Sequence, residues 1–157
     1  MVMYVSVIGG DVGSCTDKDR ERAEELGKGI AEMNMVLVCG GKVGVMEAAC
    51  RGAKSTGGTT IGILPSGDRS EGNDYLDHSI VTNLGMLRNS LVVLNGDIVV
   101  AIDGSYGTLS EISMAKKYGK RILGLGTWDV DAVEACSSVK EVLGKLKRIK
   151  DENTKSL

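Results

Sequence analysis

The sequence predicts an α/β fold, a doubly wound, Rossmann-like parallel sheet with helices on both faces. Short runs that are apolar and rich in β-branched residues alternate with longer amphipathic stretches, and glycine-rich turns follow several of the runs. Strands that are apolar throughout must be covered on both sides, and helical crossovers join parallel strands. The alternation therefore indicates a parallel sheet between two layers of helices.

The expected strands share a short, apolar, β-branched composition. They cover residues 3–8, 35–39, 59–64, 78–82, 97–102 and 121–125. The expected helices share an apolar stripe at helical spacing. They cover residues 17–33, 45–54, 84–94 and 107–118. Thr16 or Asp17 is the expected cap of the first helix, and Ser138 with Glu141 has the spacing of a capping box for one last helix. Methionines such as Met86 are expected in the core.

Length and composition predict one globular domain. The chain has 157 residues, of which 42% are hydrophobic and 25% charged. We expect a single nucleotide-binding domain over residues 1–150 and a polar, frayed tail over 151–157. The net charge of −2 and the 3% aromatic content disfavour nucleic acid as a partner. The sequence has neither a leader-like start nor an apolar stretch of membrane-spanning length, so we expect no membrane contact and a cytoplasmic location.

The four cysteines show no metal-binding spacing. Cys15, Cys39, Cys50 and Cys136 form no CxxC pair, and His78 is the one histidine. We therefore expect no metal site and four reduced, mostly buried thiols.

The first two glycine-rich turns are candidate phosphate sites. The first contains Gly9, Gly10, Gly13 and Ser14. It lacks the GxGxxG spacing of a dinucleotide fingerprint, so it serves equally well to turn the chain. The second contains Gly40, Gly41, Lys42 and Gly44 and leads directly into a helix. Its free amides and the helix dipole can hold an anion, although Lys42 taken alone also fits a surface lysine.

The most informative segment runs from Asp97 to Glu111, an expected strand, a tight turn and a helix start. Its turn reads Asp103-Gly104-Ser105-Tyr106-Gly107-Thr108. Together with residues 40–46 and 86–89, it resembles the Lonely Guy (LOG) family and the related molybdenum-cofactor carrier proteins, often mislabelled lysine decarboxylases. The resemblance covers about residues 3–126.

That resemblance implies a set of binding residues. In the superfamily the pattern PGGxGTxxE binds a nucleotide phosphate, and Gly104, Gly107, Thr108 and Glu111 match it. Asp103 and Ser105 stand where the pattern has Pro and Gly. A carboxylate at position 103 would repel a phosphate unless it faced a hydroxyl or a cation. Ser105, Tyr106 and Asn89 complete the expected phosphate-binding and nucleotide-binding residues.

The resemblance also implies catalytic residues. In the LOG phosphoribohydrolases an arginine and the motif glutamate assist cleavage between base and ribose 5′-phosphate, and Arg88 and Glu111 match them. Those enzymes carry Met-His-x-Arg-Lys, whereas this chain reads Met86-Leu87-Arg88-Asn89, closer to the carrier branch. Each residue alone also fits a structural role, Arg88 on a helix surface and Glu111 in a first turn.

The expected function is binding of a nucleotide or pterin-nucleotide phosphate at the carboxyl edge of the sheet. One alternative is a nucleoside 5′-monophosphate phosphoribohydrolase that releases free base and ribose 5-phosphate. A third is a dinucleotide-dependent oxidoreductase, and lysine decarboxylation is not expected. The implied bound group is a nucleotide or molybdopterin, and the partner beyond this small molecule is a second copy of the chain. The resemblance implies a homodimer or homotetramer built from the helices around residues 84–118.

Overall fold

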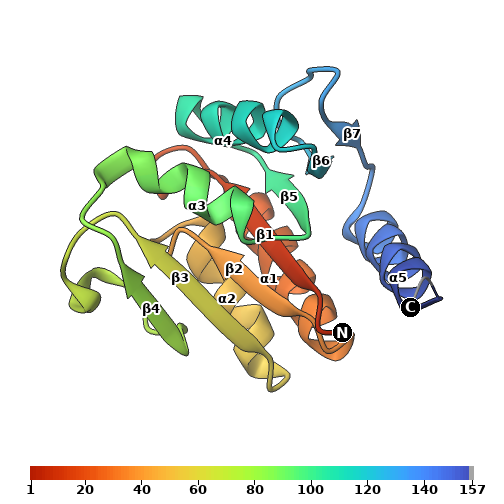
Figure 1. The fold of residues 1–157 in the computed structure, drawn as a ribbon, viewed down its shortest axis with the longest axis horizontal. Coiled ribbons are helices and arrows are strands. Elements are labelled where there is room, and N and C mark those ends of the chain that lie inside the picture. Colours follow the sequence, from red (N-terminus) through yellow and green to blue (C-terminus); the bar gives the residue numbers. More distant parts are fainter. Residues whose placement is uncertain (156–157) are drawn as a thin grey trace.

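The computed structural model describes residues 1–155 and places a parallel sheet at the centre of the molecule (Figure 1). In this range the sheet has seven strands in the order β4-β3-β2-β1-β5-β6-β7, and every neighbouring pair is parallel. The strands are β1 (Tyr4–Gly9), β2 (Val36–Cys39), β3 (Thr59–Leu64), β4 (His78–Val81), β5 (Ile98–Ile102), β6 (Arg121–Leu125) and β7 (Glu134–Ala135).

Helices cover both faces of the sheet. They are α1 (Asp17–Glu32), α2 (Val45–Ser55), α3 (Asn89–Leu94), α4 (Tyr106–Lys117) and α5 (Val139–Lys155), with short 3₁₀ turns η1 (Arg69–Glu71) and η2 (Gly85–Arg88). Apolar side chains of α1, α2 and α5 form one core with the strands, and those of α3 and α4 form a second core on the opposite face. The predicted doubly wound α/β class is confirmed.

The strand order creates a crevice beside β1. β1 pairs with β2 on one side and with β5 on the other, so the chain winds in opposite directions from this point. The turns that leave β1 and β5 separate there, at the carboxyl edge of the sheet. In open parallel sheets ligands bind at such a switch point.

The start of α1 agrees with the sequence. Thr16 Oγ1 accepts a hydrogen bond from the Asp19 amide at 3.2 Å, and Asp19 Oδ2 accepts one from the Thr16 amide at 2.9 Å. This reciprocal pair satisfies two amides that the helix itself leaves without partners. Thr16, rather than Asp17, is therefore the cap.

Three features of the expected elements differ in the structure. The helix expected over 84–94 is divided, because Gly85 has a left-handed backbone (φ 56°) and η2 precedes α3. The last helix continues to Lys155 rather than fraying after Lys150, whose Nζ donates to the Met33 carbonyl at the end of α1. Residues 156 and 157, also assigned to the frayed tail, lie outside the described residues.

The third difference concerns the start of α5. Ser138 Oγ accepts from the Glu141 amide at 3.2 Å, as a capping box requires. Glu141 Oε2, however, accepts from the amide and the hydroxyl of Ser137, at 2.8 and 2.9 Å, and not from Ser138. The strand β7, which the sequence did not predict, ends just before this point and is only two residues long.

Between residues 1 and 155, no helix has both the length and the apolar composition to cross a membrane.

Candidate functional site

A pocket of about 320 Å³ opens at the carboxyl edge of the sheet, in the crevice beside β1. This volume is at the lower end of the range of small-molecule sites. Its wall combines the ends of β1 to β3, the η2–α3 segment and the first turns of α4. The lining residues are Val7, Ile8, Gly9, Asp11, Gly40, Met46, Pro65, Gly85, Met86, Arg88, Asn89, Ser105, Gly107, Thr108 and Glu111.

Two buried charged residues form the floor of the pocket. Arg88 ends η2 and is 8% exposed, and Glu111 lies in the second turn of α4 and is 7% exposed. Arg88 Nη1 lies 4.0 Å from Glu111 Oε1 and donates a 2.6 Å hydrogen bond to Asn89 Oδ1. The Arg88 Nε–H is buried and has no protein partner. A buried donor without a partner is rare in proteins, which makes Arg88 a candidate anion-binding residue.

Burial controls the protonation of this pair. Loss of solvent raises the pKa of Glu111 to about 8, and the nearby Arg88 opposes this shift without cancelling it. Burial also lowers the pKa of Arg88, which Glu111 in turn opposes. A pKa of about 8 favours the protonated form of Glu111 at pH 7, which leaves Arg88 as the positive charge of the pair.

Gly40 makes room for the Arg88 guanidinium. A Cβ atom on Gly40 would lie 2.6 to 2.8 Å from Nη1, Cζ and Nη2 of the Arg88 guanidinium. Real Cβ atoms do not make such contacts, so a side chain here would displace Arg88 from its place. The glycine of the second turn thus determines where the arginine can lie.

The amino end of α4 faces the pocket. Ser105, Gly107 and Thr108 line it, and no side chain caps this end of the helix. The first amides of a helix have no partners within it and carry the positive end of the helix dipole. The end of α4 therefore presents free N–H donors beside Arg88, an arrangement suited to a phosphate.

The second turn is less open than the sequence suggested. The Gly41 amide donates to Cys39 Sγ at 3.3 Å, and the Val45 amide donates to the Gly10 carbonyl at 3.0 Å. Lys42 Nζ lies 3.1 Å from Glu71 Oε2 and is paired there rather than lining the pocket. This turn contributes shape more than charge.

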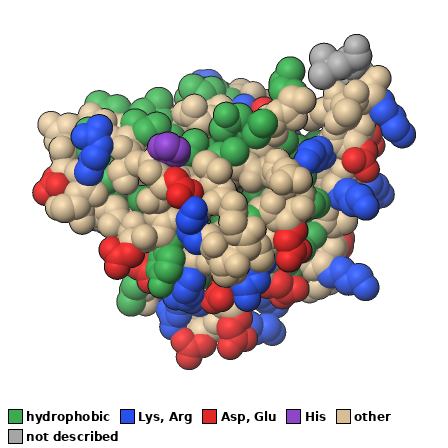
Figure 2. Space-filling view, turned by 90° about the horizontal axis from the view of Figure 1, so that it is seen from below, with side chains coloured by type: hydrophobic (Ala, Val, Ile, Leu, Met, Phe, Trp, Pro, Cys, Tyr) green, Lys and Arg blue, Asp and Glu red, His purple; other side chains and the backbone are tan. Residues whose placement is uncertain are grey.

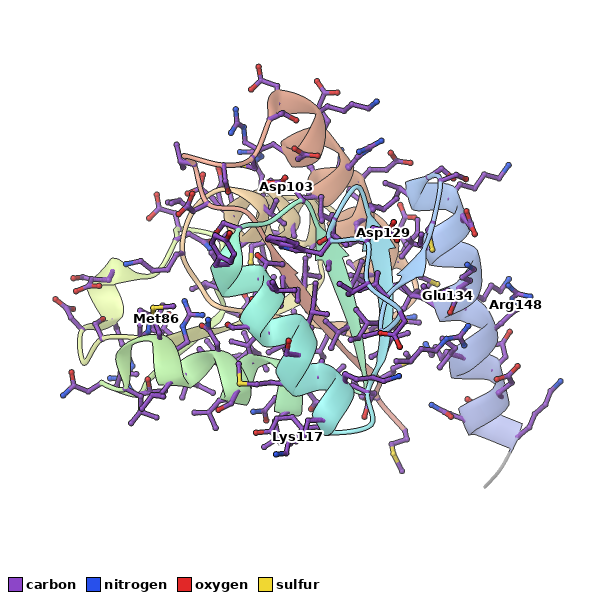
Figure 3. All side chains as sticks on the ribbon, turned by 90° about the horizontal axis from the view of Figure 1, so that it is seen from above. Met86, Asp103, Lys117, Asp129, Glu134 and Arg148 are labelled. Carbon is purple, nitrogen blue, oxygen red and sulfur yellow. The ribbon has the colours of Figure 1, made fainter. Side chains whose placement is uncertain are left out.

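The departure at position 103 has a distinct geometry. Asp103 has a left-handed backbone (φ 52°), held in place because its carbonyl accepts from Thr127 Oγ1 at 2.6 Å. Its Oδ2 is buried without a partner and lies against Gly10, where a Cβ would overlap it. Figure 3 shows Asp103 at the turn before α4, with Lys117 at the far end of that helix. The carboxylate thus packs behind the first turn rather than along the pocket wall.

The structure brings together only part of the predicted set. The predicted residues on the pocket wall are Gly9, Gly40, Arg88, Asn89, Ser105, Gly107, Thr108 and Glu111. Those that support turns around it without lining it are Gly10, Gly13, Ser14, Gly41, Lys42, Gly44, Gly104 and Tyr106.

Sequence reasoning missed several lining residues. Asp11 lies within the first turn, between two of the predicted glycines, and its position there was the available signal. Met86 was expected in the core, but it is 73% exposed and lies at the pocket, at the η2 segment seen in Figure 3. The reason is that the η2 turn directs the Arg88 side chain inward and the Met86 side chain, two residues earlier, outward. Pro65 and Gly85 come from separate loops and have no local signal.

Comparison with known proteins places this geometry in a family. An uncharacterized protein of Archaeoglobus fulgidus is 42% identical over 124 residues, covering 79% of this chain and 80% of its own length. A cytokinin riboside 5′-monophosphate phosphoribohydrolase of Mycobacterium tuberculosis is 33% identical over 95 residues, covering 59% of this chain and 51% of its own length. The match to this enzyme thus spans about half of the enzyme.

Solved structures match almost the whole chain. The molybdenum cofactor binding protein from Rippkaea orientalis has a TM-score of 0.88 and 36% identity, with coverage of 95% of this chain and 98% of that one. The molybdenum cofactor carrier protein from Chlamydomonas reinhardtii also has a TM-score of 0.88, with 32% identity and coverage of 96% and 99%.

Fold and site together define a protein of the LOG and molybdenum-cofactor carrier superfamily, which confirms the resemblance drawn from the sequence. Within it, the chain belongs to the SLOG cluster4 family, whose model matches residues 2–154.

Proposed function

We propose that the pocket binds the phosphate of a nucleotide or of a molybdopterin-type group, and that the protein holds this molecule rather than cleaving it. The observation that carries the proposal is the buried, unpaired Nε–H of Arg88 beside the uncapped amino end of α4. Arg88 and the amino end of α4 line the same pocket, and both favour a bound negative charge.

The residues have separate roles in this proposal. The α4 amides and Arg88 hold the phosphate, Gly40 keeps the guanidinium in position, and Asn89 orients it through the 2.6 Å hydrogen bond. Burial raises the pKa of Glu111 to about 8, so in this proposal its protonated form donates a hydrogen bond to the ligand without repelling the phosphate.

Hydrolysis is the second candidate, favoured by the 4.0 Å Arg88–Glu111 pair and by the phosphoribohydrolase relatives. A neutral carboxyl, however, can neither stabilise a positively charged sugar nor take a proton from water. The missing histidine and lysine of the enzyme motif also favour the carrier role.

Two measurements separate these candidates. Native mass spectrometry of the purified protein identifies a retained nucleotide or pterin, and calorimetry with AMP and GMP gives affinities. We expect saturable binding and no adenine release from AMP in a base-release assay. Release of the base would establish the hydrolase, and failure of AMP, GMP and molybdopterin to bind would overturn the proposed site.

Arg88→Met tests the site itself. Because a hydrogen bond to a charged group contributes about 1.5–3 kcal/mol, we expect phosphate ligands to bind roughly 10-fold to 100-fold more weakly. Lys117→Met removes the same charge at the opposite end of α4 and should leave the affinity unchanged. Equal affinities of the two variants would remove Arg88 from the site.

We also propose that the protein is a homo-oligomer that forms through the α3 side of the sheet. Large apolar side chains are exposed there, with Met86 at 73% and Leu87 at 75%. Ile80, Leu84 and Leu94 belong to the same region. Figure 2 shows hydrophobic side chains along the upper side of the view and charged ones along the lower side. Exposed apolar patches of this kind favour association.

A further inference from the structure

Two cysteines touch directly beneath the second turn. Cys39 is the last residue of β2, and Cys50 lies in the middle of α2. Their sulfur atoms are 3.5 Å apart, and both residues are completely buried. Cys15 and Cys136 have different surroundings, beside Arg20 at 3.3 Å and beside Lys145 at 3.5 Å.

The Cys39 sulfur is also linked to the ligand pocket. It accepts the 3.3 Å hydrogen bond from the Gly41 amide. Gly40, which follows Cys39 in the chain, packs against the Arg88 guanidinium. The two thiols are not equivalent. The Cys50 thiol, the Gly41 amide and Arg88 together lower the pKa of Cys39 against the effect of burial. The hydrogen bond to Cys39, together with burial, raises the pKa of Cys50. Cys39 is therefore the more easily ionised of the two thiols, and we assign its sulfur as the nucleophile.

We propose that Cys39 and Cys50 are a redox-active pair that a peroxide converts to a disulfide, and that this bond changes the shape of the ligand pocket. The bond itself does not depend on the proposed function, whereas its effect on affinity rests on that function.

The chemistry balances with hydrogen peroxide as the oxidant. The Cys39 thiolate attacks one peroxide oxygen, the O–O bond breaks, and a sulfenic acid forms while hydroxide leaves and takes up a proton to become water. The Cys50 sulfur then attacks the Cys39 sulfur and loses its proton, and the sulfenic oxygen leaves as a second water. Two thiols and one hydrogen peroxide give one disulfide and two waters, and the two sulfurs together lose two electrons.

Disulfide formation must move the turn. An S–S bond is about 2.05 Å long, so the two sulfurs must approach each other by roughly 1.5 Å. We expect part of this movement to occur at Cys39, which would lengthen its hydrogen bond from the Gly41 amide and shift Gly40 against Arg88. Because displacements of about 1 Å in a binding site can change rates and affinities strongly, we expect the oxidised protein to bind AMP roughly tenfold more weakly.

Peptide mapping tests the bond. Trypsin cuts after Lys28, Lys42 and Arg51 and so places Cys39 and Cys50 on separate peptides. After peroxide treatment and alkylation of remaining thiols, we expect these two peptides to be joined, and dithiothreitol to separate them. Cys50→Ala should abolish the joined species and leave a Cys39 sulfenic acid that dimedone traps. Absence of the joined peptides from peroxide-treated wild-type protein, whether or not Cys136 is oxidised, would overturn the proposal.

The Gly41 amide reports the effect on the turn without any ligand. We expect its NMR shift and its hydrogen exchange to change between reduced and oxidised wild-type protein, and AMP affinity to fall in parallel. If AMP binds neither form, the proposed function fails, and the Gly41 amide still decides the coupling. An unchanged amide signal in the disulfide form would show that the bond does not reach the turn and would overturn the coupling.

Discussion

Arg88 and Glu111 are unusual residues in this chain because both are charged types and both are buried. Among residues 1–155, just two other charged or amide side chains, Asp19 and Asn89, are classed as buried. Asp19 has its capping hydrogen bonds and Asn89 has Arg88, whereas Arg88 keeps an unpaired donor. Buried polar groups without partners are rare in proteins, and of the two among the described residues, Arg88 Nε and Asp103 Oδ2, only the arginine belongs to a residue that lines the pocket.

Glu111 gives a prediction for the pH dependence of stability. Its pKa is about 8 in the folded protein and near the ordinary glutamate value of 4.5 in the unfolded chain. A raised folded pKa means that the native state keeps a proton which the unfolded state loses. This stability is therefore fully present below pH 4.5 and is lost as the pH rises through about 8.

We expect the free energy of unfolding of the wild type to decrease between pH 5 and 8 by at most about 5 kcal/mol. The melting temperature should fall over the same range. Glu111→Gln, which resembles the neutral carboxyl, should flatten this decline. Glu47→Gln, in the first turn of α2, provides a control that should keep the wild-type profile. An unchanged slope in Glu111→Gln would mean that Glu111 is ionised in the folded protein.

At the scale of elements, glycines bring α1 and α2 into backbone contact. A Cβ on Gly27 would overlap the Ala49 carbonyl oxygen, and a Cβ on Gly52 would overlap the Glu24 carbonyl oxygen. Backbone atoms cannot move aside as a flexible side chain can. The two helices must therefore separate if either glycine is replaced.

We expect Gly27→Ala and Gly52→Ala each to destabilise the protein by roughly 1–3 kcal/mol, despite the higher helix propensity of alanine. Gly144 in α5 is the matched control, because nothing lies within 4 Å of a Cβ there. Gly144→Ala should be neutral or stabilising by up to about 1 kcal/mol. Urea unfolding measures all three, and stabilisation by Gly27→Ala would contradict the close contact.

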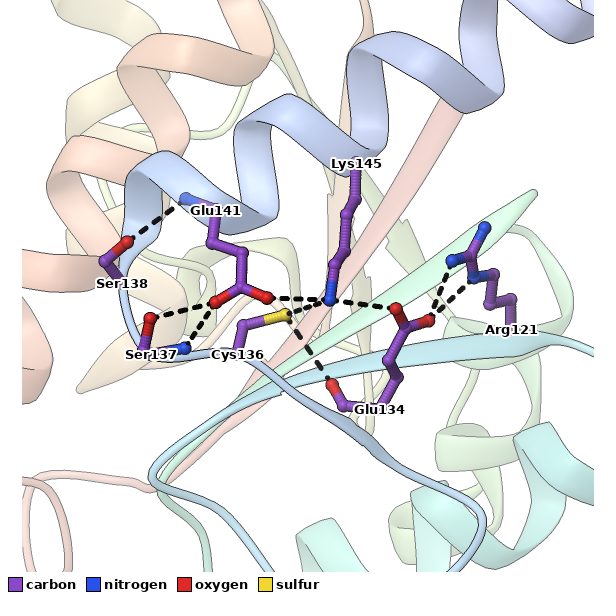
Figure 4. A network of polar contacts seen from close by, with 7 residues as sticks. All are labelled: Arg121, Glu134, Cys136, Ser137, Ser138, Glu141 and Lys145. Atoms are coloured by element: carbon purple, nitrogen blue, oxygen red, sulfur yellow. Dashed lines mark hydrogen bonds and ion pairs between the residues drawn. The ribbon is translucent and has the colours of Figure 1, made fainter.

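A second contact between elements joins β6, β7 and α5. Lys145 Nζ lies 2.8 Å from Glu134 Oε1 and 2.8 Å from Glu141 Oε1, and Arg121 binds the other Glu134 oxygen at 2.8 and 3.0 Å (Figure 4). Lys145, followed by the Ser137 amide and hydroxyl, lowers the pKa of Glu141 from 4.5 to about 2. Because this pKa is lowered by folding, the stability it provides is present above pH 4.5 and is lost as the pH falls toward 2.

Lys145→Met should therefore weaken the dependence of the melting temperature on pH between 5 and 2. Lys147→Met removes an exposed charge two residues further along α5 and should retain the wild-type acid profile. Thermal scans across this range provide the measurement. Identical acid profiles for wild type and Lys145→Met would show that the ion pairs do not persist in solution.

At the scale of the whole molecule, the proposed oligomer makes the exposed region near α3 a testable surface. We expect native mass spectrometry to find a dimer or tetramer, and Leu87→Glu to shift it to the monomer, because burying a charge without a partner is costly. Val2→Glu alters another exposed apolar residue, 53% accessible, and should leave the assembly intact. A monomeric wild type at micromolar concentration would contradict the proposed oligomer.

The sequence by itself determined the parallel α/β architecture, because a strand buried on both faces leaves a short continuous apolar run and an amphipathic helix leaves an apolar stripe of period 3.6. Both patterns are local and need no knowledge of the rest of the chain. It also identified Arg88 and Glu111, through motifs that stay contiguous in the chain. β7 escaped prediction because two residues carry no period, and α5 extends past Lys150 because a contact with the end of α1 holds it.

Only the tertiary structure decided which candidates share a space and what charge they carry. Lys42 and Gly40 are two residues apart, yet one pairs with Glu71 outside the pocket and the other lies against Arg88 within it. The protonation of Glu111 and the contact between Cys39 and Cys50 depend on burial and on atoms from distant segments. Solvent exclusion and the distances between atoms of distant segments arise only when the chain packs, so no local sequence pattern predicts them.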